Sequence, residues 1–142
     1  AMLAIPEIRL LDGIVVGRVD MVGSMDLDRK SVNSEKVFSI TMDLLKAAKD
    51  RGLSCVVGGA IAVDSLPFLR AIPVDMIDRY ETRKVCFSCP AALGDTAEKG
   101  INKAVGFELL WLKSKRDYYR AISQEDEKRI AMLEERFAKA GA

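Results

Sequence analysis

One aspartate stands where an apolar run ends: Asp20 directly follows residues 14–19, a short segment rich in β-branched side chains. Such a run suits a buried strand of a parallel sheet, and ligands gather at the carboxyl ends of those strands. Carboxylate oxygens are preferred ligands of Mg²⁺ and Mn²⁺, which makes Asp20 a candidate metal ligand. The alternative is that Asp20 only caps the turn after its strand.

Two glycines and part of the run Glu81-Thr82-Arg83-Lys84 are expected near the same edge of the sheet. Gly58 and Gly59 follow a second apolar run, 53–57, and backbone N–H groups of such a pair can hold an anion. Arg18 and Arg83 carry forked donors that match a carboxylate, so they are candidates for substrate binding. The glycines could equally serve only a tight turn, and Arg83 could face solvent or form a structural ion pair.

The sequence contains no histidine. This absence excludes Ser-His-Asp and Cys-His catalysis and imidazole-bound zinc within the chain. Proton transfer would have to use a carboxylate, lysine, tyrosine, cysteine, water or a partner chain. No general base is identified among these groups.

The three cysteines predict a reducing compartment. Cys55, Cys86 and Cys89 are odd in number, and the first two lie in apolar, strand-like runs. Buried free thiols in a cytoplasmic protein are therefore expected. The spacing Cys86-x-x-Cys89 could also form a redox or zinc pair, but the sequence has no second pair to complete it.

Length, charge and hydropathy limit the class of protein. The 142 residues suit one domain, and a formal charge of +1 at pH 7 without a basic block argues against nucleic-acid binding. No apolar run approaches the roughly 20 residues needed to cross a bilayer, so no membrane partner is expected. Ala1 before Met2 resembles an expression remnant, and the expected domain is 2–142.

Apolar periodicity predicts strands and helices in alternation. Strands are expected at 14–19, at 53–57 and within 76–87, with helices at 32–51 and 64–72 between them. Strands that are separated by helices predict a parallel sheet with right-handed crossovers. The fold class is therefore α/β.

The last third of the sequence predicts helices only. Residues 2–90 are expected to hold the β/α units and residues 91–142 a helical extension. Ser123-x-x-Asp126 is typical of a capping box, which would begin a separate last helix. The predicted order of elements is β-α-β-α-β-α-α.

In this order the motifs resemble the HpcH/HpaI aldolase and citrate lyase β-subunit family. Three segments resemble the sixth, seventh and eighth strands of that family's barrel, and a fourth resembles its C-terminal extension. These segments are Gly17-Arg18-Val19-Asp20-Met21, residues 55–59, residues 78–84 and residues 107–111. The resemblance implies part of a TIM (β/α)₈-type barrel, with about three parallel strands, crossover helices and C-terminal helices.

The resemblance also implies a function. Asp20 would bind Mg²⁺ or Mn²⁺ in a carbon–carbon lyase or aldolase that acts on a 2-oxo acid or related carboxylate through an enolate. Arg18, Gly58, Gly59 and Arg83 would bind this small-molecule substrate. A complete barrel needs about 250 residues, so the family's second metal ligand, a glutamate on the preceding strand, would lie outside this chain.

Two functions and a second fold stay open. The chain could be a lyase that another segment or copy completes, or a catalytically inactive half-barrel that oligomerises or regulates. Both predict a homo-oligomer or a complementing barrel half, because three barrel strands leave open edges and an exposed apolar face. The alternative architecture is a small flavodoxin-like sheet.

Overall fold

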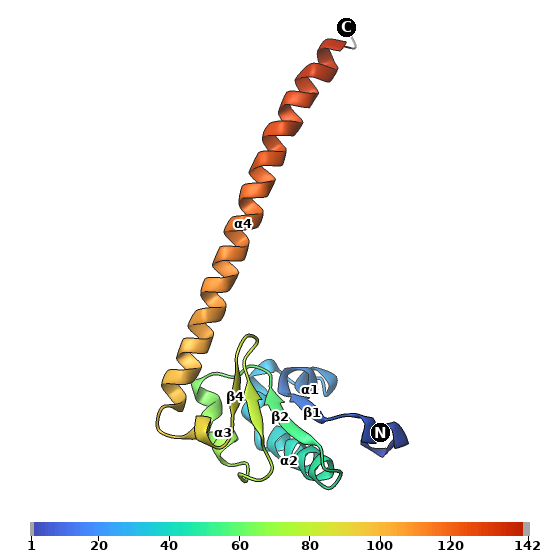
Figure 1. The fold of residues 1–142 in the computed structure, drawn as a ribbon, viewed down its shortest axis with the longest axis vertical. Helices are drawn as coiled ribbons and strands as arrows, with labels where there is room; N and C mark the ends of the chain where they lie inside the picture. Colours follow the sequence, from blue (N-terminus) through green and yellow to red (C-terminus); the bar gives the residue numbers. More distant parts are fainter. Residues whose placement is uncertain (1, 141–142) are drawn as a thin grey trace. The chain divides into compact units, whose positions relative to one another are not determined.

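The computed structural model describes residues 2–140 and shows an α/β fold around a small mixed sheet (Figure 1). The strands follow the order β1-β2-β3-β4, in which the first three are parallel and β4 is antiparallel to β3. The strands are β1 Gly13–Gly17, β2 Ser54–Gly58, β3 Arg79–Glu81 and β4 Cys86–Ser88. The α-helices are α1 Arg18–Ser24, α2 Glu35–Lys49, α3 Leu66–Arg70 and α4 Ala97–Ala140.

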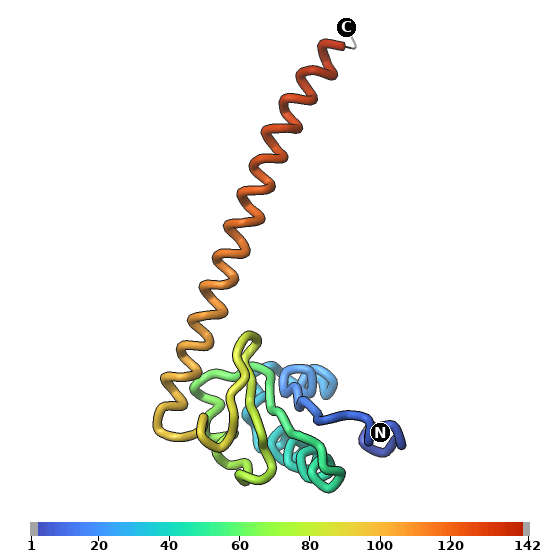
Figure 2. The backbone as a smooth tube through the Cα atoms, in the orientation of Figure 1, coloured from blue at the N-terminus to red at the C-terminus, as the bar shows by residue number. Residues whose placement is uncertain are grey.

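Two crossovers connect the parallel strands, as the path of the backbone shows (Figure 2). The first runs from β1 through α1 and α2 to β2, and the second runs from β2 through α3 to β3. The α2 helix begins where the Ser34 hydroxyl accepts a hydrogen bond from the backbone N–H of Val37. Val37, Leu45 and Ala48 form its buried face. The predicted α/β class and parallel pairing of the first strands are confirmed.

Helices cover one face of the sheet, and the other face is open. The strand register places Val15 beside Val56 and Val56 beside Arg79 on the open face. Val15 is 58% exposed, whereas Val16, on the opposite face, is 4% exposed. The covered face is apolar and consists of Ile14, Val16, Cys55, Val57, Tyr80 and Phe87.

The predicted boundaries at the carboxyl end of β1 are wrong. The strand was expected at 14–19, but it ends at Gly17 and α1 begins at Arg18. Asp20 therefore lies in the first turn of a helix and not at the tip of a strand.

A hairpin replaces the single third strand that was expected within 76–87. The backbone N–H of Thr82 donates to the carbonyl of Val85, and the chain then returns as β4 beside β3. Phe87 stacks on Tyr80 with ring centroids 4.7 Å apart, which fixes the returning strand against the core. The sheet is consequently mixed and not purely parallel.

One helix, α4, replaces the two C-terminal helices that were expected. Ser123 lies inside it, because residues 107–140 contain neither glycine nor proline to interrupt the helix. Packing divides the described chain into one unit that ends at Gly106 and a second that begins at Phe107. Ile101 and Ala104 of α4 are buried in the first unit, whereas no described residue from Phe107 onward is buried.

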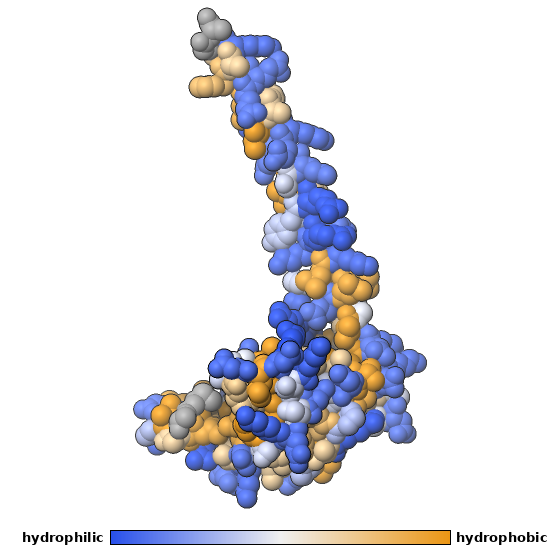
Figure 3. Space-filling view, turned by 180° about the vertical axis from the view of Figure 1, so that it is seen from behind, coloured by the Kyte–Doolittle hydropathy of each residue, from blue (hydrophilic) through white to orange (hydrophobic). Residues whose placement is uncertain are grey.

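No helix among the described residues is both long enough and apolar enough to cross a membrane. Hydrophobic residues alternate with hydrophilic ones along the visible face of α4 (Figure 3).

Candidate functional site

Asp20 lies in the first turn of α1, just beyond the carboxyl end of β1, and its side chain turns back over the strand. Asp20 is exposed, and a Cβ atom at Gly17 would lie 2.8 Å from its Oδ2 atom. A side chain at position 17 would therefore displace the carboxylate from its place over the strand. Gly17 alternates with Val16 along the strand, so this position belongs to the open face of the sheet.

A second carboxylate, Glu81, lies over the neighbouring strand. A Cβ atom at Gly58 would lie 3.2 Å from Cγ and 3.3 Å from Oε1 of Glu81. Gly17 and Gly58 are direct partners in the parallel ladder, where strands are about 4.8 Å apart. Asp20 and Glu81, hereafter the carboxylate pair, thus each lie over one of two paired glycines.

Glu81 was not among the predicted site residues. It was expected only as a member of the run Glu81-Thr82-Arg83-Lys84, part of which would lie near this edge of the sheet. Its approach to Gly58 depends on the register between β2 and β3, which pairs Val57 with Tyr80 one residue earlier. The available signal was the two-residue spacing from Arg79, since alternate residues of a strand share one face.

The carboxylate pair could supply two protein ligands to a metal ion. Mg²⁺ is commonly held by one or two carboxylates and keeps several waters. Within residues 2–140 there is no group of three or more histidine, cysteine, aspartate and glutamate side chains arranged to hold a metal ion. A cation held by the pair would therefore have to take its remaining ligands from water or from another molecule.

Arg18 is fully buried, and the protein itself occupies its donors. Its Nη2 atom donates to the Gly59 carbonyl at 2.8 Å, and its Nη1 atom donates to Asn33 Oδ1 at 2.6 Å. Its Nε atom donates to the Gly58 carbonyl at 3.3 Å. Burial lowers the pKa of Arg18 to about 10, an effect that the negative charge of Asp64 partly offsets. The side chain ties the start of α1 to the end of β2.

Gly59 allows the chain after β2 to approach the start of α1. Its φ of +85° lies in the left-handed region, and a Cβ atom there would lie 2.7 Å from the backbone nitrogen of Val19. The same Cβ atom would lie 2.8 Å from the nitrogen of Arg18. The close approach explains Gly59, while Gly58 makes room for Glu81.

Of the predicted site residues, Asp20, Gly58, Gly59 and Arg18 gather around the carboxyl ends of β1 and β2. Arg83 lies outside this group of residues. It is exposed in the turn that connects β3 to β4, beyond the last residue of β3. Its predicted role in substrate binding stays a prediction.

Asp78 has a structural role just before β3. Its Oδ2 atom accepts hydrogen bonds from the backbone N–H of Cys55 at 2.6 Å and from Lys49 Nζ at 2.7 Å. Burial by itself raises the pKa of Asp78, but these two hydrogen bonds and the nearby positive charges outweigh it and lower the pKa. The carboxylate therefore joins α2, β2 and β3.

The cysteines of the Cys86-x-x-Cys89 motif are both free thiols in the structure. Burial raises the pKa of Cys89 to about 11, with further contributions from Asp78 and Cys86. The Cys89 thiol is accordingly neutral at pH 7 and poorly suited to nucleophilic redox chemistry.

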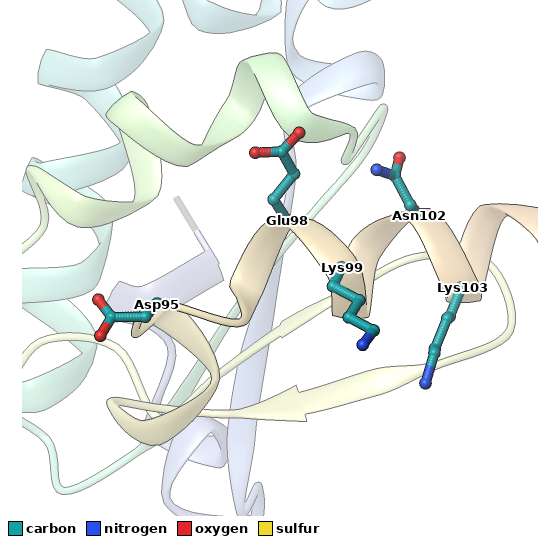
Figure 4. Close-up of a pocket in the computed structure, with 5 residues that line it drawn as sticks. All are labelled: Asp95, Glu98, Lys99, Asn102 and Lys103. Atoms are coloured by element: carbon teal, nitrogen blue, oxygen red, sulfur yellow. The ribbon is translucent and has the colours of Figure 1, made fainter.

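None of the predicted site residues lines the surface hollow in Figure 4. Side chains from the start of α4 line it, with carboxylates and ammonium groups mixed and Lys99 and Lys103 extending from the same side of the helix. The lining residues are Asp95, Glu98, Lys99, Asn102 and Lys103.

Comparisons with protein-family models, with curated proteins and with solved structures found no match. Functional inference therefore depends on the carboxylate pair and on the open face of the sheet.

Proposed function

We propose that this chain forms part of a metal-dependent carbon–carbon lyase or aldolase-like enzyme and that Asp20 helps to bind Mg²⁺ or Mn²⁺. The observation that carries the proposal is the carboxylate pair, which lies over two paired glycines on the open face. The pair lies at the carboxyl ends of parallel strands, where barrel enzymes bind their substrates.

The chemistry of the proposed site follows from its donors. A bound divalent cation would polarise the carbonyl oxygen of a 2-oxo acid and stabilise the enolate that forms when a carbon–carbon bond breaks. Asp20 and Glu81 would hold the cation from one side and leave other positions for water and a small-molecule carboxylate. In this proposal the second carboxylate is supplied by Glu81, within the chain, whereas the family resemblance implied an upstream glutamate.

The one-sided sheet supports a partial barrel. In a (β/α)₈ barrel, helices cover the outer face of the strands and side chains fill the inside. A flavodoxin-like sheet instead has helices on both faces. Val15 and Val56 would face the barrel interior, and β1 has a free edge where a further strand could pair. A cytoplasmic location and completion by another copy or segment belong to the same proposal.

The second candidate is a catalytically inactive half-barrel that associates with other chains. One observation favours it: the donors of Arg18 are occupied by backbone and side-chain oxygens of the protein itself. A substrate carboxylate would therefore need another cationic partner, either Arg83 or a residue of a second chain.

Metal binding distinguishes the two candidates. Mn²⁺ affinity should be measured by isothermal titration calorimetry for the unaltered chain, Asp20→Asn and Glu81→Gln. We expect each substitution to weaken binding by tenfold or more, because each removes one of two carboxylate ligands. Asp43→Asn on the exposed side of α2 is the matched control and should leave the affinity unchanged. Equal affinities in all four proteins would reject the metal site and favour the inactive half-barrel.

A further inference from the structure

An exposed apolar seam runs along α4. Its apolar side chains recur at alternating spacings of four and three residues, and they are 45–83% exposed. Positions 116, 123 and 126 continue the spacing but carry polar side chains. The seam consists of Val105, Leu109, Leu112, Arg116, Tyr119, Ser123, Asp126, Ile130, Leu133 and Phe137.

Such a seam is typical of a helix that packs on a second helix. A repeat of seven residues with two apolar positions keeps one face toward a partner over many turns. Residues 105–137 would span about 50 Å at 1.5 Å per residue. A helix of this kind in water gains most of its stability from packing of its apolar face.

We propose that the seam binds the same seam of a second copy in antiparallel orientation. The charges inside the seam carry the argument. When Leu109 faces Leu133 of the second copy, the two-fold axis passes near Ala121, and Arg116 then faces Asp126 of the second copy. The two charged positions that interrupt the seam therefore neutralise each other across the interface.

The other facing positions of the two seams, hereafter layers, also match in this alignment. Ile130 faces Leu112 of the second copy, and Phe137 faces Val105. Ser123 faces Tyr119, so the last polar position meets a hydroxyl group. Every layer thus pairs apolar with apolar, acid with base, or hydroxyl with hydroxyl.

A parallel alignment in register would be unfavourable. It would place Arg116 against Arg116 and Asp126 against Asp126, and like charges inside a seam repel. In the single chain, Arg116 forms an exposed ion pair with Asp117 at 2.8 Å. Exposed pairs of this kind contribute little stability, so this contact does not oppose pairing with Asp126.

Charges beside the seam are mixed and do not set the orientation. In the antiparallel alignment Glu108 lies near Arg136 of the second copy, which is favourable. Lys115 lies near Arg129, and Arg120 lies near its own counterpart, which is unfavourable. The orientation therefore depends on Arg116 and Asp126.

The test is a charge exchange measured by sedimentation equilibrium on the full chain. Arg116→Asp and Asp126→Arg should each weaken self-association by tenfold or more, because each creates like-charged layers. The double variant R116D/D126R should return to within about threefold of the original dissociation constant. Lys128→Asp makes the same change in charge as Arg116→Asp but lies on the side of α4 opposite the seam, so it should have no effect.

Leu112→Asn and Leu110→Asn form a second matched pair, because both leucines are about half exposed or more and only Leu112 belongs to the seam. Only Leu112→Asn should weaken association, and circular dichroism should show retained helix in every variant. A chain that stays monomeric at a protein concentration of about 100 μM would overturn the proposal. Failure of the double variant to recover would also overturn it, as would equal association of all variants. None of these outcomes depends on the metal site.

Discussion

Arg18 shows how one side chain can connect distant segments of the chain. Its guanidinium group lies 4.7 Å from the Phe68 ring centroid and donates to the carbonyls of Gly58 and Gly59. Gly58 is the last residue of β2, and Gly59 is the first residue after the strand. Without Arg18, several buried oxygens would lose their donors.

Replacement of Arg18 should therefore destabilise the α/β unit. Arg18→Met keeps much of the side-chain volume but removes every donor, and we expect a loss of about 3 kcal/mol in the free energy of unfolding. Arg70→Met is the control, since Arg70 is exposed and also donates to two carbonyls, those of Leu93 and Gly94. Urea unfolding should show a loss of about 1 kcal/mol or less for this control. Equal losses would mean that burial of Arg18 contributes nothing beyond its hydrogen bonds.

The candidate site could be predicted only in part at this scale. Asp20 and the glycines were identified because they follow apolar runs, and sequence order alone places such residues at one sheet edge. Glu81 could not be identified in this way, because its position over Gly58 depends on the register of strands that are far apart in sequence. The interior position of Arg18 was also hidden, since arginine is rarely buried.

At the scale of elements, the close contact between the end of β2 and the start of α1 depends on Gly59. Gly59 and Gly52 both have positive φ, +85° and +72° respectively. Their surroundings differ, because a Cβ atom at Gly52 would meet nothing within 4 Å. Substitutions at these two glycines can therefore separate the cost of a left-handed backbone from the cost of a close contact.

Gly59→Ala should be much more destabilising than Gly52→Ala. We expect about 1 kcal/mol for Gly52→Ala, from the left-handed backbone alone. Gly59→Ala should cost roughly 3 kcal/mol or more, because its Cβ would also displace the start of α1. Urea unfolding of both variants measures the difference. Similar values would show that α1 can move away from β2 at little cost.

Some elements were predictable and others were not, for identifiable reasons. The α2 helix and the first two strands have clear apolar periodicity and end signals, and all three were predicted. The turn between β3 and β4 consists of Thr82, Arg83, Lys84 and Val85 and has neither glycine nor proline, so the hairpin appeared as one strand. The Ser123-x-x-Asp126 pattern suggested a helix start, but nothing before it ends α4.

At the scale of the whole molecule, the two faces of the sheet should respond differently to the same substitution. Val15→Thr replaces a methyl group with a hydroxyl group on the open face, and Val16→Thr does so in the core. In dilute solution we expect less than about 0.5 kcal/mol for Val15→Thr and roughly 1 to 3 kcal/mol for Val16→Thr. The measurement is urea unfolding at low protein concentration.

The same pair of variants also reports on assembly. If another chain covers the open face, Val15→Thr should become destabilising as the protein concentration rises, whereas the cost of Val16→Thr should stay constant. A high cost for Val15→Thr even in dilute solution would contradict an open face in the single chain.

The antiparallel strand β4 makes the two borders of the sheet unlike each other. On the β1 side a further β/α unit could repeat the parallel pattern, as β1 and β2 already do. On the β4 side the returning strand of a hairpin interrupts that pattern. Growth of this fold by duplication or by grafting of β/α units therefore has a direction: new units fit beside β1, ahead of Gly13 in the chain, and not beyond Ser88.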